Sequence, residues 1–293
     1  MAEGRITTRT REILRRHGLH LKKSLGQNFL TEDHVLHQIV EAADLDENAG
    51  VLEIGPGIGA LTEHLAEEAK SVIAVELDQR LLPILQELFV AYPHVTILHG
   101  DAMKVDLHQV IEEHLGDCKK RHVVANLPYY VTSPILMRLL EERLPLDSIV
   151  IMVQKEVAER LTSEPGTKAY GSITVTTQYF TEPEWVTLVP AHVFMPPPQV
   201  DSAVIRLKIR PKPPVAVNNE GLFFRVVRAS FGQRRKTLPN AISAGLFGGK
   251  RKGEITLWLE EAGIDPKRRG ETLSLEEFAH FTNFLDERLD EHA

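Results

Sequence analysis

A glycine-rich turn after a strand-like run constrains this chain more than any other feature of its sequence. Val51–Ile54 is apolar apart from Glu53, and Gly55, Gly57 and Gly59 follow at alternate positions. Such a turn lets ligand atoms approach the backbone, and the N–H groups at the start of the next helix point toward them. The pattern predicts a nucleotide-binding crevice at the carboxyl end of a parallel strand.

Around this turn, short β-branched runs alternate with amphipathic stretches, which predicts βαβ units and a parallel sheet. The expected strands are Val51–Ile54, Val72–Glu76, Val95–Leu98, His122–Ala125 and Ser148–Val153, and the expected helices are Leu61–Ala69, Arg80–Ala91 and Pro134–Leu144. Three further strand-like runs predict an antiparallel addition to that sheet: Ile173–Phe180, Trp185–Val189 and Ala203–Ile209.

Beyond the prolines around Pro211 the sequence becomes helical and basic. Helical spacing returns in Leu222–Phe231, Leu257–Ala262 and Leu275–Leu289. We therefore expect an α/β domain over residues 1–210, with a basic N-terminal segment, and a smaller all-helical domain over residues 211–293. A chain of 293 residues is long enough to bury two such cores.

Charge is distributed unevenly, so the net charge of −7 hides two basic regions. Residues 205–270 carry fifteen Lys and Arg against five Asp and Glu, and residues 5–23 carry seven against one. Residues 24–204 carry eleven against twenty-seven. One charged run is usually a solvated face, but two basic regions flanking an acidic body favour binding of a polyanion.

Composition argues against several classes of protein. The only cysteine, Cys118, can form neither an intramolecular disulfide framework nor a Cys-based zinc cluster. The thirteen histidines show no metal-ligand spacing, so no metal is expected. Met1–Thr10 lacks the apolar core of a leader, and no apolar run reaches membrane-spanning length. We expect a cytoplasmic protein that binds no membrane.

Acidic residues end the next two predicted strands. Glu76 follows Gly55 by twenty-one residues, which is typical of an acid that accepts hydrogen bonds from a nucleoside ribose. Asp101 could accept a hydrogen bond from an adenine amino group. The glycine turn alone, with Ala60 at its end, also fits a dinucleotide-dependent enzyme. The turn and the two acids together favour an adenosine-bearing ligand.

Asn126-Leu-Pro-Tyr129 follows the fourth predicted strand and decides the chemistry. It resembles the Asn/Asp-Pro-Pro-Tyr motif of methyltransferases that act on exocyclic amino groups. The chain as a whole, from about Lys22 to the C-terminal helices, resembles the ribosomal RNA adenine dimethyltransferases. The segments that carry this resemblance are Ser24–Leu30, Glu53–Gly59, Gly100–Ala102, Asn126–Tyr129, Phe194–Ala203 and Arg234–Asn240.

The resemblance implies a Rossmann-like methyltransferase domain with S-adenosylmethionine as its cofactor. It places the cofactor at Asn28, Leu30, Gly55, Glu76, Asp101 and Asn126. It makes Asn126, Leu127, Pro128 and Tyr129 the catalytic residues. It also implies RNA-binding roles for Phe194, which would close over the target base, and for Arg234, Arg235 and Lys236.

Elementary chemistry suits these catalytic roles. An adenine amino nitrogen is a poor nucleophile because its lone pair is delocalised into the ring. Two acceptors for its hydrogens, the side-chain carbonyl of Asn126 and the backbone carbonyl of Leu127, would favour a localised lone pair. Pro128 stiffens the turn that aims these oxygens, and Tyr129 can stack on the base.

Within this family the chain resembles the bacterial small-subunit enzymes, which dimethylate two adjacent adenines in a hairpin loop near the 3′ end of 16S ribosomal RNA. Arg234–Leu238 and the long basic C-terminal region favour these over the large-subunit enzymes of macrolide resistance. The alternative from another class is a non-catalytic assembly or transcription factor on the same fold. We expect a monomer that acts on the small ribosomal subunit.

Overall fold

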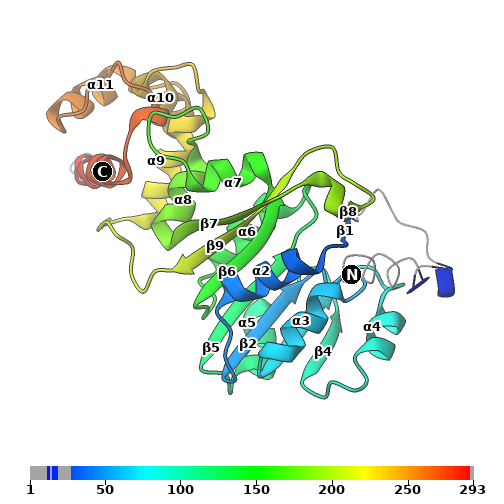
Figure 1. Cartoon of the computed structure of the whole chain (residues 1–293). Helices are drawn as coiled ribbons and strands as arrows, with labels where there is room; N and C mark the ends of the chain where they lie inside the picture. Colours follow the sequence, from blue (N-terminus) through cyan, green and yellow to red (C-terminus); the bar gives the residue numbers. More distant parts are fainter. Residues whose placement is uncertain (1–11, 14, 19–27, 291–293) are drawn as a thin grey trace. The chain divides into compact units, whose positions relative to one another are not determined.

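The computed structural model describes residues 12–13, 15–18 and 28–290 (Figure 1). The chain divides into two compact units, and the first comprises residues up to Ala158 together with Pro183–Ile209. The second unit comprises Glu159–Glu182 and the chain from Arg210 onward. Its longer segment starts at Arg210, next to Pro211, whereas its shorter segment, Glu159–Glu182, lies within the residues that the sequence analysis assigned to the first domain.

The first unit alternates strands and helices. In chain order its elements are β1 (Phe29–Leu30), α2 (Asp33–Ala43), β2 (Ala49–Ile54), α3 (Ala60–Glu68), β3 (Ser71–Glu76), α4 (Leu82–Leu88), β4 (Val95–His99), α5 (Leu107–Leu115), β5 (Lys120–Asn126), α6 (Thr132–Glu141), β6 (Ser148–Gln154), η2 (Ala191–Val193), β8 (Phe194–Met195) and β9 (Ser202–Ile209). Two elements, α7 (Lys155–Thr162) and β7 (Thr181–Val189), span the points where the chain passes between the units.

Within the described residues, the main sheet has the strand order β4-β3-β2-β5-β6-β9-β7. The strands from β4 to β6 are parallel, and β9 runs antiparallel to β6. This is the expected Rossmann-like sheet with an antiparallel addition. The chain winds from β2 outward to β4 and then returns to place β5 on the other side of β2. Ligands bind at such a switch point, where the carboxyl ends of two neighbouring strands leave a crevice.

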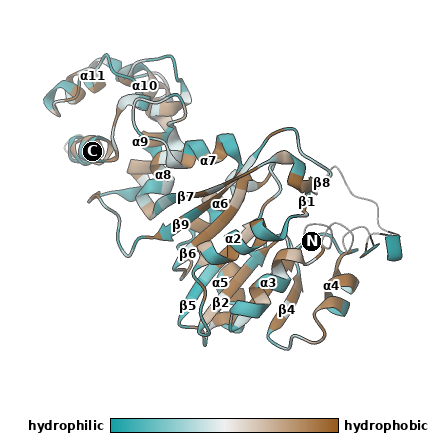
Figure 2. Ribbon diagram, viewed as in Figure 1, coloured by the Kyte–Doolittle hydropathy of each residue, from teal (hydrophilic) through white to brown (hydrophobic). Residues whose placement is uncertain are grey.

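The central strands are apolar because both faces of the sheet are covered. Every residue of β2 is buried, and Figure 2 shows β6 as hydrophobic along most of its length. Val51 lies in one core cluster with Leu36 of α2 and Leu65 of α3. Successive residues of a strand point to opposite faces, so Leu52 points to the other side, where α5 packs against β2 and β3.

The second unit is helical, with a core of its own. Its helices are α8 (Ser172–Phe180), α9 (Glu220–Gly232), α10 (Leu238–Phe247), α11 (Lys252–Glu261), η3 (Gly270–Thr272) and α12 (Leu275–Asp290). Tyr179, Phe223, Phe278 and Phe281 are among the fully buried side chains of its core. In the described part of the chain, no helix is long and apolar enough to span a bilayer.

The prediction of a strand over Ile173–Phe180 was wrong, because this segment forms α8. Its β-branched residues favour a strand locally. The hydroxyl of Thr174 supports a helix instead, since its Oγ1 accepts a 3.0 Å hydrogen bond from the Gly171 N–H at the helix start. Val175 and Tyr179, four positions apart, are both buried in the helical core of the second unit. Tertiary burial on one helical face therefore overrides the local preference.

Candidate active site

A pocket opens at the switch point of the first unit, where β2, β3 and β5 end. It is lined by every residue that the sequence analysis assigned to the cofactor and to catalysis, and by Phe194: Asn28, Leu30, Gly55, Glu76, Asp101, Asn126, Leu127, Pro128, Tyr129 and Phe194. The fold therefore brings together segments that lie more than 150 residues apart in the sequence. Arg234, Arg235 and Lys236 belong to the second unit.

The glycine turn forms one wall of this pocket. Gly55 and Gly57 have φ angles of 72° and 60°, in the left-handed region that side chains disfavour. A Cβ atom on Gly57 would also lie 2.9 Å from Cε1 of Phe29, which packs against the turn. Glycine is thus required at position 57 both by the backbone conformation and by the close approach of β1.

Glu76 ends β3 with its carboxylate at the pocket and only 6% of its surface exposed. Its Oε2 accepts a 3.1 Å hydrogen bond from the Gly57 N–H, and its Oε1 accepts one of 2.6 Å from the Asp78 N–H. Burial raises the pKa of this carboxyl, and the two amide donors oppose the shift. Glu76 therefore connects the end of β3 to the glycine turn, and its remaining lone pairs can accept from a ligand.

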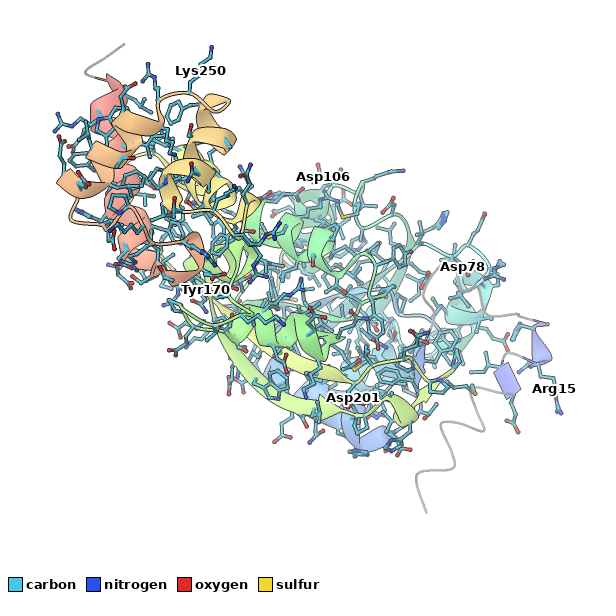
Figure 3. The ribbon with its side chains drawn as sticks, turned by 90° about the horizontal axis from the view of Figure 1, so that it is seen from above. Arg15, Asp78, Asp106, Tyr170, Asp201 and Lys250 are labelled. Carbon is cyan, nitrogen blue, oxygen red and sulfur yellow. The ribbon has the colours of Figure 1, made fainter. Side chains whose placement is uncertain are left out.

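Asp78, labelled in Figure 3, fixes the loop beyond Glu76. It is buried, and its Oδ2 lies 2.6 Å from Nη2 of Arg80 while its Oδ1 accepts a 2.9 Å hydrogen bond from Arg80 Nε. The sequence analysis did not single out this pair. The sequence pattern that could have indicated this pair is an acid two residues after the acid at the strand end, followed two positions later by a basic residue.

Asp101 follows β4 and is partly exposed, so that solvent and ligands can reach its carboxylate. Its Oδ1 accepts a 2.9 Å hydrogen bond from the Met103 N–H, and the ammonium of Lys104 lies 3.5 Å from its Oδ2. The local hydrogen bond holds the side chain in an Asx turn. Asp101 is therefore presented to the pocket by its own loop.

Asn126 ends β5 beside the glycine turn. Among the residues that the structure describes, none forms a hydrogen bond with its side-chain amide, although the side chain lines the pocket. Leu127 is buried, and the Pro128 carbonyl accepts hydrogen bonds from the Val131 N–H and from the hydroxyl of Thr132. The turn is thus held by Pro128, which leaves the polar groups of Asn126 available to a ligand.

The hydroxyl of Tyr129 lies 2.8 Å from Oγ of Ser202, the first residue of β9. Burial raises the pKa of Tyr129, so the phenol stays neutral near pH 7. This hydrogen bond fixes the ring by its far end, while the ring itself lines the pocket. Tyr130 is more than half exposed and lies at the rim.

Phe194 reaches the pocket through a second, small sheet. β8 pairs antiparallel with β1, which sets Phe194 opposite Leu30. Only 4% of Phe194 is exposed, and it belongs to the apolar core as well as to the pocket lining. Phe194 is therefore a buried residue of the pocket wall.

Glu53 is a pocket residue to which the sequence analysis gave no role of its own. It lies in the middle of β2, is 1% exposed, and lines the pocket. Burial raises its pKa to about 8, and the nearby negative charge of Glu76 acts in the same direction. Its carboxyl is therefore mostly protonated at neutral pH. The signal in the sequence is an acid inside a run of buried strand residues.

Comparison with known proteins identifies the family. The ribosomal RNA adenine dimethylase family matches residues 18–287. The chain belongs to this family. It is 58% identical to a ribosomal RNA small subunit methyltransferase A of Geobacillus kaustophilus, over 94% of this chain and 95% of that one. It is 59% identical to a protein of the same name from Anoxybacillus flavithermus, over 95% of each chain.

Solved structures support the same assignment. A dimethyladenosine transferase from Plasmodium falciparum superposes with a TM-score of 0.73 at 26% identity, covering 90% of this chain and 98% of that one. The 23S rRNA methyltransferase ErmE superposes with a TM-score of 0.66 at 27% identity, covering 88% and 100%. This adenine dimethylase is thus an S-adenosylmethionine-dependent ribosomal RNA methyltransferase.

The basic residues of this dimethylase differ in whether their side chains form hydrogen bonds with other residues of the protein. An Nη2–H group of Arg234 donates a 2.6 Å hydrogen bond to the carbonyl of Lys168, within the second unit. Arg235 and Lys236 are exposed, and no described residue pairs with their side chains. Residues 5–11, 14 and 19–27 lie outside the described residues, and these include most of the basic N-terminal segment and Ser24 to Gln27 of the family resemblance.

Proposed function

We propose that this enzyme dimethylates the N6 amino groups of two adjacent adenines in a hairpin loop near the 3′ end of 16S ribosomal RNA, acting as a monomer on the small subunit during its biogenesis. The observation that carries this proposal is the position of Asn126–Tyr129 at the switch point, in one pocket with Glu76 and Asp101. The curated relatives, which bear the name of small-subunit methyltransferases, support the choice of ribosomal subunit.

One group of pocket residues would hold the cofactor. Glu76 would accept hydrogen bonds from the cofactor ribose, and Asp101 would accept one from its adenine amino group. Asn28, Leu30 and Gly55 would complete the walls that hold the cofactor. The sulfonium of S-adenosylmethionine supplies an activated methyl group when bound, so the protein contributes mainly orientation. No protein nucleophile is needed.

Asn126 would prepare the target amine. Its side-chain carbonyl has no hydrogen-bond partner among the described residues, and the carbonyl of Leu127 follows it at the end of β5. Acceptors on both amino hydrogens would favour a pyramidal nitrogen whose lone pair points at the methyl group. Pro128 keeps these oxygens aimed, because its ring fixes the backbone of the turn.

Two aromatic rings would hold the base once it leaves its stack. Tyr129 is fixed by its hydroxyl to Ser202, so its face is preset for stacking on a flipped base. Phe194 would contact the base from within the pocket. We assign Phe194 to the target base, and the contacts with RNA phosphates to basic residues of the second unit.

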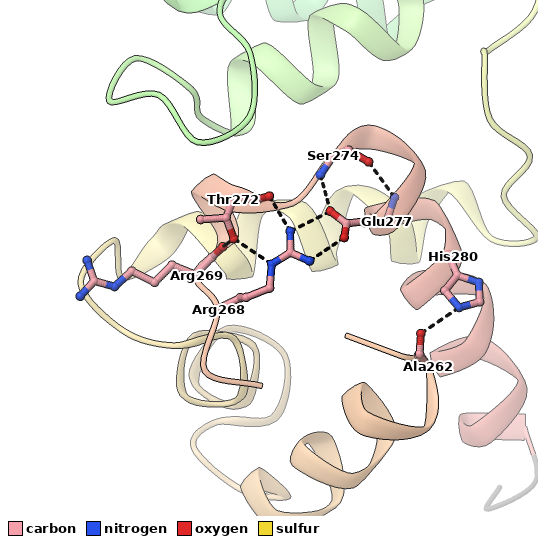
Figure 4. Close-up of polar contacts among 7 residues, drawn as sticks. All are labelled: Ala262, Arg268, Arg269, Thr272, Ser274, Glu277 and His280. Atoms are coloured by element: carbon pink, nitrogen blue, oxygen red, sulfur yellow. Dashed lines mark hydrogen bonds and ion pairs between the residues drawn. The ribbon is translucent and has the colours of Figure 1, made fainter. Parts of the chain in front are cut away.

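The second unit would grip RNA phosphates without reading their sequence. Figure 4 shows that Arg268 is engaged by Glu277, with Nη1 to Oε1 and Nη2 to Oε2 distances of 2.5 and 2.8 Å, while the side chain of Arg269 points away from this cluster. Lys250 extends outward from the ribbon in Figure 3. Arg235, Lys236, Lys250 and Arg269 are therefore the cations that we assign to phosphate contacts.

The decisive experiment is transfer of labelled methyl groups from S-adenosylmethionine to small ribosomal subunits that lack the modification. We expect two dimethylated adenines per particle, mapped to adjacent positions of one loop near the 3′ end. A parallel assay uses large ribosomal subunits, because the structural likeness to the 23S rRNA methyltransferase ErmE makes them the main alternative substrate. Label on large subunits alone would replace the proposed substrate, and no transfer to either particle would favour a non-catalytic role.

A further inference from the structure

Three side chains of types that can bind a metal ion lie close together on two packed helices of the first unit. Asp33 and His37 lie one turn apart on α2, and His64 lies on α3. Nε2 of His64 lies 2.9 Å from Asp33 Oδ1, and Nε2 of His37 lies 3.5 Å from Asp33 Oδ2. One ligand atom from each of the three residues lies within 4.8 Å of the others. Sequence spacing gave no sign of this cluster, because His64 comes from a separate helix.

The hydrogen bonds of His64 favour a positive charge between its ring and the carboxylate of Asp33. Its Nδ1 lies 3.0 Å from the carbonyl oxygen of Ala60, which can only accept, so Nδ1 carries a proton. In the neutral ring, Nε2 then presents a lone pair to the Asp33 carboxylate at 2.9 Å. Two lone pairs at that distance repel each other unless a cation lies between them. That cation is either a second ring proton or a metal ion.

The surroundings favour a metal ion. A ring nitrogen bonded to a backbone carbonyl is the usual support of a metal-ligating histidine, since it fixes both the tautomer and the ring orientation. Tetrahedral zinc with bonds of about 2.0–2.2 Å needs ligand atoms roughly 3.4 Å apart. The carboxylate of Asp33 lies at about this spacing from both rings, with Oδ1 2.9 Å from His64 Nε2 and Oδ2 3.5 Å from His37 Nε2. The rings of His37 and His64 are edge to face, with centroids 4.7 Å apart. A small rotation of the exposed His37 would complete the triad.

We propose that Asp33, His37 and His64 bind one Zn²⁺ ion, with water as the fourth ligand, and that the ion fastens α2 to α3. His64 is largely buried, with 14% of its side chain exposed, while 63% of the His37 side chain is exposed, which leaves a path for the ion and the water. Both helices carry walls of the pocket, Leu36 on α2 and Leu61 on α3. The ion would therefore stiffen the frame of the cofactor site without touching it.

The test is zinc binding by the full chain without cofactor, measured by equilibrium dialysis and by titration against a chromophoric chelator. We expect one Zn²⁺ per chain, and a rise in the thermal unfolding temperature when it binds. His37→Ala removes one of the three protein ligands, so it should weaken binding by at least the roughly tenfold that loss of an outer-shell partner costs at other metal sites. His37 is exposed, so the variant should fold, and circular dichroism checks this.

The matched control is His34→Ala, which removes an exposed histidine of the same helix, 3.7 Å from Glu32 and outside the cluster. It should leave zinc affinity unchanged. Co²⁺ in place of Zn²⁺ should give the visible absorption of a tetrahedral site in the wild type and in His34→Ala, and lose it in His37→Ala. Equal zinc affinity in all three proteins, or no stoichiometric binding by the wild type, would overturn the proposal and leave the contact of His64 with Asp33 as an ordinary hydrogen bond between two helices.

Discussion

The carboxylate of Glu76, at the end of β3, accepts a 3.1 Å hydrogen bond from the backbone N–H of Gly57, in the turn that follows β2. The acid that we assign to the cofactor ribose therefore also holds the turn that forms the pocket wall. Binding of a ribose and order of the turn depend on the same side chain. Substitutions at position 76 should consequently affect both.

Glu76→Ala should weaken S-adenosylmethionine binding by about 1.5–3 kcal/mol, the range for hydrogen bonds to a charged group. Glu76→Gln is the matched control, because its amide oxygen can still accept from the Gly57 N–H or from a ribose hydroxyl. We expect it to retain a larger share of the affinity. Isothermal titration calorimetry on folded variants measures both. Unchanged affinity in the alanine variant would contradict the assignment to the ribose.

Asn126→Ala should reduce the single-turnover rate of methyl transfer by at least about 100-fold, the scale for removal of one preorganised polar group from an active site. RNA affinity should persist, because the exposed cations belong to the second unit. Rapid-quench kinetics with saturating cofactor and small subunits tests this. A rate near that of the wild type would show that Asn126 does not act on the target amine.

Replacing Arg235 and Lys236 with alanine should flatten the dependence of RNA affinity on salt. Each lost phosphate contact removes slightly less than one unit from the slope of log affinity against log salt, so we expect a change of up to about 2. Cofactor affinity should stay constant. Binding assays at several salt concentrations decide the matter, and parallel lines for both proteins would mean that these side chains are only a solvated surface.

Arg234 should behave differently from its two neighbours. Because its guanidinium donates to the Lys168 carbonyl at 2.6 Å, Arg234→Ala should lower the free energy of unfolding by about 1 kcal/mol. Arg235→Ala removes no hydrogen bond to a described residue, so it should lower the free energy of unfolding by less than about 0.5 kcal/mol. Urea denaturation of the two single variants makes the comparison. Equal stability would remove the structural role that the geometry gives to Arg234.

Glu53 should make the stability of the protein depend on pH. Its folded-state pKa of about 8 exceeds the unfolded value, which is close to the ordinary 4.3 of a glutamate. The folded state therefore binds more protons between these values. The contribution of Glu53 to the free energy of unfolding is fully present below about pH 4.3. It falls as pH rises toward 8, by up to about 1.4 kcal/mol per pH unit.

Glu53→Gln removes this titration and keeps the shape of the side chain. The difference in free energy of unfolding between the variant and the wild type should grow with pH from about 5 to 8. Urea denaturation without cofactor, repeated across that range, gives the two curves. Curves that stay parallel would show that Glu53 is already ionised in the folded protein, in spite of its burial.

Local sequence patterns determined most of the first unit, which contains the proposed cofactor site. The alternation of buried strands with helices fixed the parallel sheet, and parallel strands place their carboxyl ends at one edge. Glu76, Asp101 and Asn126 therefore had to lie near the glycine turn, whatever the rest of the chain does. The family resemblance added the identity of the reaction, because Asn126–Tyr129 follows the strand next to that turn.

Tertiary structure alone decided the features that depend on contacts between distant segments. Burial against the helical core turned Ile173–Phe180 into α8, and pairing of β8 with β1 buried Phe194 in the pocket wall. The carbonyl of Lys168 accepts a hydrogen bond from Arg234, whereas no described residue pairs with the side chain of Arg235, although the two arginines are adjacent in sequence. Propensity and spacing act over a few residues. These outcomes depend on which distant surface each side chain meets, and only the packed chain determines that.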